Sequence, residues 1–367
     1  MHIAIFGAGI AGLMSAITLR MHGHSCDVYE RSRLTYDSGM GFILLPEAIT
    51  CMDEMGIQLT GDCSGVPLER YVCRNSRGEV LYEEAMPARS RSIRRRELIN
   101  ALANAARATD VIKFSSELED LEFDRHGYVT TAVLSSGERI MADLFVAADG
   151  AHSQARRILF PDWLVPQARV IEVVGLVRCA KTTQWTGHSL NKFHAADGGL
   201  AVGIVPVDTD HIVWFMQFDS LRFPPPYTRD ASSLEWRDFV QKLAGKWAHP
   251  VDYLLAIAES RHMHLWQPID TELIPYFHQE NLVLAGDAAH PLSPFTSRGV
   301  SSAIADAVAL ANALPVKNEK GLLRKGLDFY SNQRHRQCAP YLRKGRELMQ
   351  NFLAPVNSNS FMLPLAR

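Results

Sequence analysis

The chain has 367 residues, with 38 lysines and arginines, 40 aspartates and glutamates, and a formal net charge of −2 at pH 7. This balance gives no electrostatic reason to expect a nucleic acid or an anionic membrane as a partner. Six scattered cysteines without a CxxC pair argue against a disulfide framework. Glycines interrupt the apolar amino terminus, and no apolar run approaches the ~20 residues of a membrane span, so we expect a cytoplasmic protein.

The first thirty residues predict a strand, a glycine-rich turn, a helix and a second strand that ends at Glu30. Residues 2–6 form a short apolar run typical of a buried parallel strand, and "GAGIAG" follows at once. In this GxGxxG spacing Gly7 permits the tight turn, Gly9 lets a pyrophosphate approach, and Gly12 allows close helix–strand packing. The helix N-terminus would offer N–H groups to phosphates, and Glu30 would accept hydrogen bonds from a ribose. The motif predicts dinucleotide binding without choosing between NAD and FAD.

Two later stretches repeat the arrangement of strand, acidic turn and helix. Residues 142–160 predict a strand, a turn at Asp149-Gly150 and a helix. Residues 281–314 predict a strand that ends at Asp287, then a proline-bearing loop, and an alanine-rich helix after Gly299. Carboxylates at strand ends can hold ribitol or ribose hydroxyls, although aspartate is also common in plain turns and N-caps. The ordered coincidence of three such stretches favours one long nucleotide over three unrelated turns.

Together these stretches resemble the class A flavoprotein monooxygenases, the family of aromatic hydroxylases such as p-hydroxybenzoate and salicylate hydroxylase. The first stretch is similar to the family's ADP-binding motif, Asp149-Gly150 to its DG motif, and Gly286-Asp287 to its GD motif. The resemblance implies an α/β fold in which a Rossmann-like FAD-binding domain is interleaved with a mixed β-sheet substrate domain, followed by a C-terminal helical segment. The implied bounds are 1–65, 91–160 and 271–315 for the FAD-binding domain, 66–90 and 161–270 for the substrate domain, and 316–367 for the helical segment.

The resemblance also implies roles for single residues. The loop from Pro291 to Gly299 would lie over the reactive face of the flavin, with Pro294 nearest the oxygen chemistry and Arg298 adding a charge; these two are the catalytic candidates. Arg95, in "RRREL", resembles an arginine that reaches FAD. The implied cofactor-binding residues are Gly7, Gly9, Ala11, Gly12, Glu30, Arg31, Arg95, Asp149, Gly150, Gly286, Asp287, Gly299 and Val300.

The sequence departs from the family pattern near the flavin ring. Relatives usually have Gly-Gln-Gly, where this chain has Ser297-Arg298-Gly299, and Glu47 stands where they often have asparagine. Ser297 adds a Cβ where the ring should pass, so a different loop path is open.

The resemblance implies that NADPH or NADH reduces FAD, that O2 adds to the reduced flavin at C4a, and that the hydroperoxide hydroxylates a small aromatic or polyketide-like substrate. Two alternatives stay open: a flavin-dependent reductase or oxidase of the same superfamily, and a non-catalytic FAD-binding protein. A flavin halogenase is disfavoured because the chain lacks a Trp-x-Trp-x-Ile-Pro element. The sequence leaves open the substrate, the preferred nicotinamide nucleotide and the oligomeric state, whether monomer or homodimer.

Residues 200–220 predict two strands joined by an aspartate-rich turn, as part of the substrate-covering sheet. By alternation, one face of the second strand carries Trp214, Met216 and Phe218, and the other carries Val213, Phe215 and Gln217. One face should cover the substrate cavity, but the pattern does not say which.

Histidines give no convincing metal site. The pairs His22/His24 and His262/His264 lack a third ligand at a suitable spacing, so we expect no bound metal, and His290 is better explained as part of the loop architecture. Residues 321–353 predict one long basic helix or two. A solvated helix face over the FAD-binding domain explains this stretch better than a nucleic-acid patch.

Overall fold

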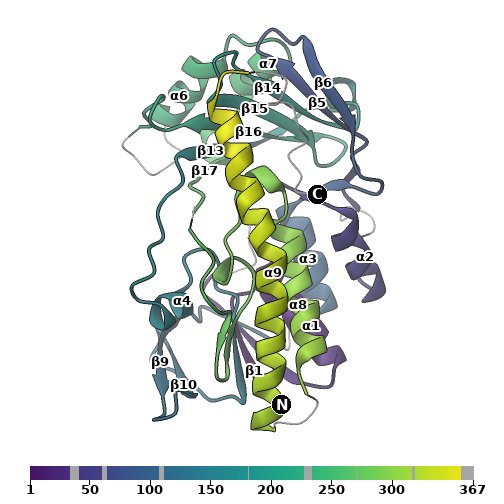
Figure 1. Ribbon diagram of the computed structural model, residues 1–367. Helices are drawn as coiled ribbons and strands as arrows, with labels where there is room; N and C mark the ends of the chain where they lie inside the picture. Colours follow the sequence, from purple (N-terminus) through teal and green to yellow (C-terminus); the bar gives the residue numbers. More distant parts are fainter. Residues whose placement is uncertain are drawn as a thin grey trace.

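The computed structural model describes residues 1–33, 41–59, 64–106, 111–180, 182–226, 234–269, 271–315 and 319–356 (Figure 1). One of its two large sheets has six strands in the order β18-β19-β12-β1-β2-β8, parallel except for β18. The inner strands are almost wholly buried, which explains their continuous apolar sequences. These strands are β1 (His2–Phe6), β2 (Ser25–Glu30), β8 (Ile112–Phe114), β12 (Leu144–Ala147), β18 (His278–Gln279) and β19 (Leu282–Leu284).

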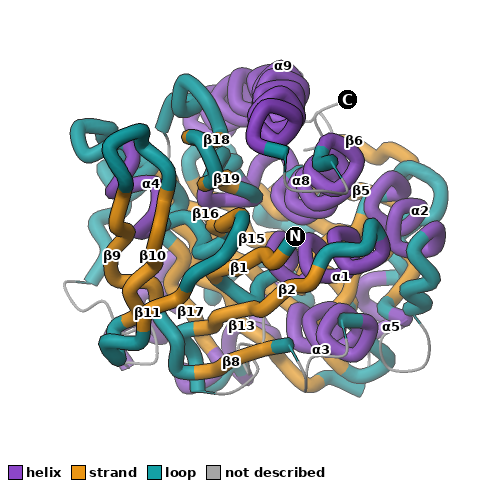
Figure 2. Tube along the Cα trace, turned by 90° about the horizontal axis from the view of Figure 1, so that it is seen from below, coloured by secondary structure: helices purple, strands orange, loops and turns teal. Residues whose placement is uncertain are grey.

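Helices cover one side of the six-stranded sheet. Helix α1 (Ile10–Met21) connects β1 to β2 and packs against α8 (Gly299–Ala313) and α3 (Arg95–Ala105). The Thr18 hydroxyl of α1 donates to the Ala307 carbonyl of α8 at 3.1 Å. On the other side lie α4 (Gln154–Leu159) and the small sheet of β9 (Leu118–Phe123), β10 (Val129–Leu134) and β11 (Arg139–Ile140) (Figure 2).

The second large sheet has seven strands in the order β17-β13-β16-β15-β14-β5-β6 and is mixed, because only β14 and β5 pair in parallel. The predicted strands of residues 200–220 are confirmed as its neighbours β15 and β16. Trp214, Met216 and Phe218 pack with α6 (Leu234–Ala244) and α7 (Val251–Ile257) in a second hydrophobic core. The strands are β5 (Arg70–Asn75), β6 (Val80–Ala85), β13 (Val170–Arg178), β14 (Ser189–His194), β15 (Leu200–Pro206), β16 (His211–Asp219) and β17 (Met263–Trp266).

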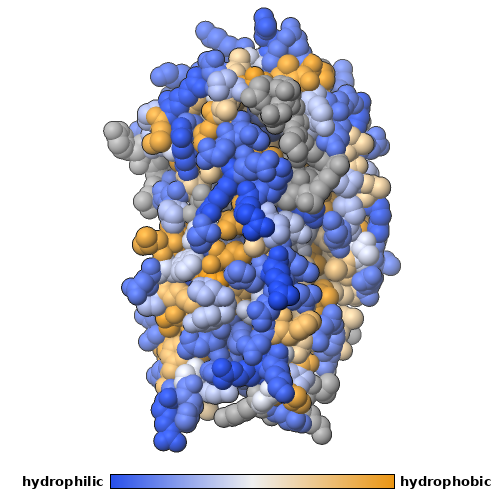
Figure 3. All heavy atoms as spheres, in the orientation of Figure 1, coloured by the Kyte–Doolittle hydropathy of each residue, from blue (hydrophilic) through white to orange (hydrophobic). Residues whose placement is uncertain are grey.

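One helix, α9 (Lys320–Leu353), runs from the six-stranded sheet to the seven-stranded sheet (Figure 1). The predicted basic stretch is therefore one helix, and mainly hydrophilic side chains follow its line at the surface (Figure 3). Residues 316–318 and 357–367 of the predicted C-terminal segment lie outside the described residues. The remaining elements are β3 (Gly41–Leu44), α2 (Pro46–Glu54), β4 (Val66–Pro67), β7 (Arg91–Arg94), α5 (Thr182–Thr186) and the 3₁₀ turns η3 (Ser260–His262), η4 (Gly286–Ala288) and η5 (Pro294–Thr296).

The predicted fold class is confirmed: a Rossmann-like parallel sheet with helices stands beside a mixed sheet in an α/β protein. The segment bounds of the two domains stay a prediction. Of the pair His262/His264, His262 ends the turn η3 and His264 lies on β17, which begins at Met263. Within the described ranges no helix has the length and apolar character needed to cross a bilayer.

Candidate active site

The glycines after β1 differ in what surrounds them. A Cβ on Gly12 would lie 1.8 Å from the Gly7 carbonyl oxygen, and one on Gly7 would lie 2.3 Å from the Ala148 carbonyl oxygen. A Cβ on Gly9 would meet no protein atom within 4 Å. Gly7 and Gly12 therefore let α1 pack against the sheet, whereas Gly9 keeps open the space at the N-terminus of α1, where N–H groups face outward.

Glu30 ends β2 beside this turn. Its carboxylate is buried and accepts hydrogen bonds from the Ala8 N–H at 2.7 Å and the Ser32 N–H at 2.9 Å. It also borders a cavity of about 560 Å³, together with the neighbouring Arg31. Glu30 thus holds the glycine-rich turn and presents a carboxylate to the cavity.

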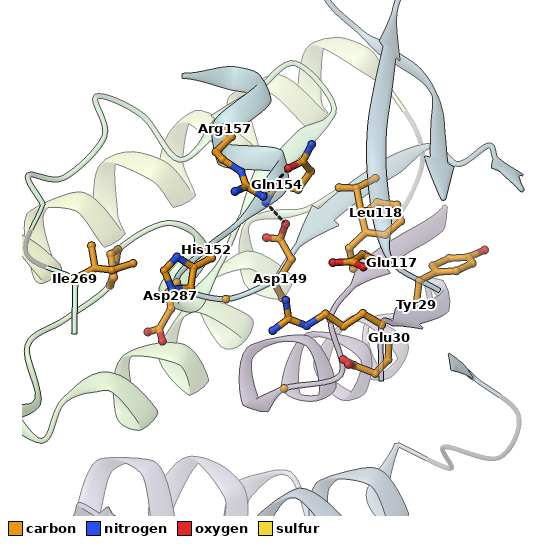
Figure 4. A pocket seen from close by; sticks show the side chains of 18 of the residues that line it. Tyr29, Glu30, Glu117, Leu118, Asp149, His152, Gln154, Arg157, Ile269 and Asp287 are labelled. Atoms are coloured by element: carbon orange, nitrogen blue, oxygen red, sulfur yellow. Dashed lines mark hydrogen bonds between the residues drawn. The ribbon is translucent and has the colours of Figure 1, made fainter. Parts of the chain in front are cut away.

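Asp149 borders the middle of the same cavity, with Glu30 on one side and Asp287 on the other (Figure 4). Its Oδ2 accepts from the backbone N–H groups of Gln154 at 2.7 Å and Ala155 at 3.2 Å, so it caps the start of α4. Its Oδ1 is buried without a hydrogen-bond partner among the described residues. Oδ2 of Asp149 therefore serves the start of a helix, as the plain interpretation of this turn expects. Oδ1 has no hydrogen bond and lies next to the cavity, which points to a polar ligand there.

Arg156 joins the two acidic turns. It lies behind Asp149 on α4, and its guanidinium donates to the carbonyl oxygens of Asp287 and Ala288, both at 2.9 Å, and to that of Ala151. The side chain is almost fully buried. Arg156 therefore fixes the distance between the turns through their backbones.

Asp287 lies where the first cavity meets a second one of about 450 Å³. Its side chain is exposed toward these cavities. Desolvation by the surrounding protein raises the pKa of Asp287 above its usual value, against the opposing charges of His290, Arg95 and Arg156. A carboxylate at this junction is suited to accept hydrogen bonds from hydroxyl groups.

A buried ion-pair cluster behind Asp287 holds its loop. Asp306 of α8 accepts from the Gly286 N–H at 2.6 Å, contacts His290 Nε2 at 2.7 Å and accepts from Arg334 Nε of α9 at 2.5 Å. Burial alone would raise the pKa of Asp306, but His290 and Arg334 lower it. Asp306 was not predicted from the sequence, although it is the one charged residue of the alanine-rich helix α8, which was the available signal. His290 belongs to the loop architecture, in agreement with its interpretation from sequence.

The second cavity lies between the loop after Asp287 and the seven-stranded sheet. Of the two faces of β16 left open by the sequence, the one with Val213, Phe215 and Gln217 lines it. Most other lining residues of the sheet are apolar, namely Val174, Leu190 and Val205, while Glu172, Lys192 and Gln217 form one polar group. On the loop side the lining residues are Ser293, Pro294, Phe295, Ser297, Arg298, Gly299 and Val300.

The predicted site residues surround these two cavities. The first is bordered by Gly7, Gly9, Glu30, Arg31, Arg95, Asp149, Gly150 and Asp287. The second is bordered by Gly9, Ala11, Arg95, Gly150, Asp287, Pro294, Arg298, Gly299 and Val300. Gly12 and Gly286 lie behind these linings, where Gly12 contacts the backbone of Gly7 and Gly286 contacts Ala11. Their effect on a ligand is through the backbone path.

The departures at 297–299 have a visible consequence. Ser297 has φ 52°, the left-handed conformation in which glycine is common, so this residue carries the turn and Gly299 instead begins α8. Arg298 turns toward α2 and α9: its guanidinium donates to the Glu47 carboxylate at 3.0 Å and lies 5.3 Å from the Tyr341 ring centroid. Partial burial by itself would raise the pKa of Glu47. Hydrogen bonds from the Glu47 backbone and from Arg298 outweigh this effect and lower the pKa.

The described histidines that were weighed as metal ligands join no group of three ligands. A different group, Asp208, Asp210 and His211 in the turn between β15 and β16, has its ligand atoms within 4.8 Å of one another. These groups pair among themselves and with Arg94 and Arg178. Internal ion pairs therefore account for the cluster.

The donor set fits FAD. The two cavities share Gly9, Arg95, Gly150 and Asp287, so they form one continuous lining suited to a long dinucleotide. Gly9 and the α1 N-terminus would face the diphosphate, Glu30 the adenosine ribose, and Asp287 the ribityl chain. The unpartnered Asp149 oxygen supports a polar occupant between them.

Comparisons with known proteins agree with this geometry. The family described as "FAD binding domain" matches residues 1–344. The chain is 29% identical to the FAD-dependent urate hydroxylase of Klebsiella pneumoniae over 84% of this chain and 80% of that protein. It is 28% identical to the kynurenine 3-monooxygenase of Salinispora arenicola over 85% and 72%.

Among solved structures, Klebsiella pneumoniae HpxO complexed with FAD and uric acid superimposes with a TM-score of 0.82 and 25% identity, covering 95% of this chain and 87% of that one. The shared fold, the family match over most of the chain and the arrangement of the three turns lead to one conclusion. The chain belongs to the class A FAD-dependent monooxygenases of the aromatic-hydroxylase type.

Proposed function

We propose that this enzyme uses NADPH or NADH and O2 to hydroxylate a small aromatic or polyketide-like substrate. The observation that carries the proposal is the second cavity, which separates the loop of residues 291–299 from the apolar side of the seven-stranded sheet. The FAD and uric acid in the similar HpxO complex support a flat substrate next to the flavin. A cytoplasmic location and the absence of nucleic-acid partners stay predictions.

FAD supplies the redox chemistry when bound, taking electrons from the nicotinamide nucleotide and activating O2 for transfer of one oxygen atom. The residues of this chain bind, orient and exclude water. Asp287 and the α1 N-terminus hold the nucleotide, while Phe215, Val205 and Leu190 give the substrate a dry apolar wall. Pro294 and Arg298 are proposed to border the reacting side, and the Arg298–Glu47 ion pair positions that arginine.

The test is turnover by the purified FAD-loaded protein in air. NADPH or NADH is added with a panel of phenols, aromatic acids and bicyclic aromatic compounds, and we measure nucleotide oxidation, O2 uptake and product mass. We expect substrate-stimulated oxidation and a product heavier by one oxygen atom, which carries the label when ¹⁸O2 is used. Reduction of a substrate double bond without O2 uptake would show the alternative reductase. Flavin that neither nucleotide reduces would contradict the proposed electron donor.

A further inference from the structure

Three polar side chains form a buried row on the cavity side of the seven-stranded sheet. Glu172 lies on β13, Gln217 on β16 and Lys192 on β14, and each is at most 5% exposed. All three border the second cavity. The sequence pattern did not identify Glu172 or Lys192, although each is a charged residue with uncharged residues on both sides in its strand.

The row is connected by side-chain hydrogen bonds. The Lys192 ammonium donates to Gln217 Oε1 at 2.6 Å, and Gln217 Nε2 donates to Glu172 Oε1. Glu172 and Gln217 are direct cross-strand partners, whereas Lys192 is two strands from Gln217. The intervening β15 positions are Ala201, opposite Gln217, and Gly203, opposite Lys192. The Phe215 ring fills the space beside Gly203. The small side chain of Ala201 leaves room for the lysine to reach across β15 toward Gln217.

Two aromatic rings enclose the ammonium from outside the sheet. Lys192 Nζ lies 5.2 Å from the ring centroid of Phe295, in η5, and 5.5 Å from that of Phe352, near the end of α9. Phe295 belongs to the loop that borders the cavity on the flavin side. Cation–π contacts of this kind stabilise a desolvated ammonium. The lysine is therefore held in place on the sheet side of the cavity, whereas the other lining cations, Arg95 and Arg298, lie outside this sheet.

Burying this row removes charged groups from water, which costs desolvation free energy. A buried ion pair therefore often contributes no more stability than apolar residues of the same size. Burial lowers the pKa of Lys192 to about 8, opposed by Glu172, and raises the pKa of Glu172 to about 7, opposed by Gln217 and Lys192. Burial also raises the pKa of Cys73 on β5 to about 11 and lowers that of His194 on β14, so both neighbours are uncharged near neutral pH. Lys192 is the one cation of the described row. Its ammonium group has three N–H donors, and Gln217 accepts a hydrogen bond from one of them.

We propose that Lys192 anchors an anionic oxygen of an acidic planar substrate, with Gln217 and Glu172 as positioning residues that hold the ammonium toward the cavity. The inference rests on the proposed function, which it deepens by naming the substrate class: ring compounds that carry a carboxylate, phenolate or enolate. The apolar wall takes the ring, and the charged row selects the acid over its neutral analogue.

The experiment titrates the oxidised FAD-loaded protein with hydroxybenzoate isomers and hydroxynaphthoate, each against its carboxamide, and follows the flavin absorbance change. We expect wild type to bind at least one acid about tenfold or more tightly than its carboxamide, since a charge-assisted hydrogen bond is at stake. Lys192→Met should remove this preference, whereas Lys192→Arg and the surface control Lys325→Met should keep it. Glu172→Gln should keep the preference at low pH but lose it at a lower pH than wild type does, because Glu172 opposes the lowering of the Lys192 pKa. The acid affinity of wild type should fall as the pH rises through about 8.

Equal binding of acids and carboxamides, acid preference that survives Lys192→Met, or acid preference lost in Lys325→Met would each overturn the proposal. Absence of acid binding to flavin-loaded wild type would overturn it as well. The titration needs neither nicotinamide nucleotide nor O2. Acid preference without an oxygenated product would therefore refute only the proposed function, and product formation without acid preference would refute only the anchoring role.

Discussion

Gly9 and Gly12 belong to one motif but are constrained by different neighbours. The backbone of Gly7 fills the space beside Gly12, while the space beside Gly9 opens toward the first cavity. Gly9 also has an ordinary extended backbone, with φ −77° and ψ −172°, which alanine adopts without strain. The motif thus separates into a residue that close packing requires and a residue that borders the space proposed for the ligand.

We expect Gly12→Ala to lower the free energy of unfolding by about 1–3 kcal/mol, because its methyl group forces the turn and the helix apart. Gly9→Ala should leave the stability of the flavin-free protein unchanged within about 0.5 kcal/mol but weaken FAD binding about tenfold or more. Urea unfolding of the flavin-free proteins and fluorescence titration with FAD measure the two effects. Equal losses of stability in both variants would contradict this division.

At the scale of elements, α8 and α9 support the loop that carries Asp287. Asp306 of α8 gathers the Gly286 N–H, His290 and Arg334 in a region without solvent access. Arg334 also donates to the Ser302 carbonyl and hydroxyl oxygens at 3.1 and 2.8 Å, which ties α9 to α8. The position of the Asp287 carboxylate therefore depends on two helices that border the cavity little or not at all.

We expect Asp306→Asn to lower the free energy of unfolding by about 3–5 kcal/mol, since His290 and Arg334 would lose their buried counter-charge. Burial alone would lower the pKa of His290, but Asp306 reverses this and holds it well above 6.5. The stabilisation by protonated His290 is therefore fully present below pH 6.5 and is lost as the pH rises through the raised pKa. Unfolding measured across pH should show the largest difference between wild type and variant on the acidic side. A difference that grows with pH would contradict the assigned ion pair.

At the scale of the molecule, α9 connects the two large sheets. Near its start the Tyr330 hydroxyl donates to the Leu284 carbonyl of β19 at 2.9 Å. Near its end the Phe352 carbonyl accepts from the Gly199 N–H beside β15 at 2.7 Å, and its ring packs against Phe295. The same ring lies over Lys192, so the helix that joins the sheets also contacts the lysine that borders the second cavity.

Two phenylalanines of α9 test this connection, because Phe352 is 6% exposed and Phe329 is 63% exposed. We expect Phe352→Ala to lower the free energy of unfolding by about 3 kcal/mol and to weaken acid binding, since a buried ring and its contact with Lys192 are lost. Phe329→Ala should change stability by less than about 0.5 kcal/mol. Thermal unfolding and the flavin absorbance titration give both results. An equal loss of stability in both variants would mean that a change in helix content, and not the loss of the Phe352 contacts, causes the destabilisation.

The local elements could be predicted because each has a local cause. Alternating residues gave β15 and β16, and the glycine and aspartate positions gave the turns at Gly7, Asp149 and Asp287. The sequence could not choose between the faces of β16, because both are apolar apart from Gln217. In the structure α6 and α7 cover the face that carries Trp214, so the opposite face is the one that borders the cavity.

The sequence by itself determined the α/β class, the three turns, their order and the family with its FAD cofactor, because these features depend on residues close together in the chain. Tertiary structure decided which distant side chains meet. Lys192 reaches Gln217 only because β15 lies between β14 and β16 and carries the small Ala201 opposite Gln217. Asp306 reaches Gly286 only because α8 packs behind the loop. Strand order and helix packing set these distances, and no periodicity along the chain records them.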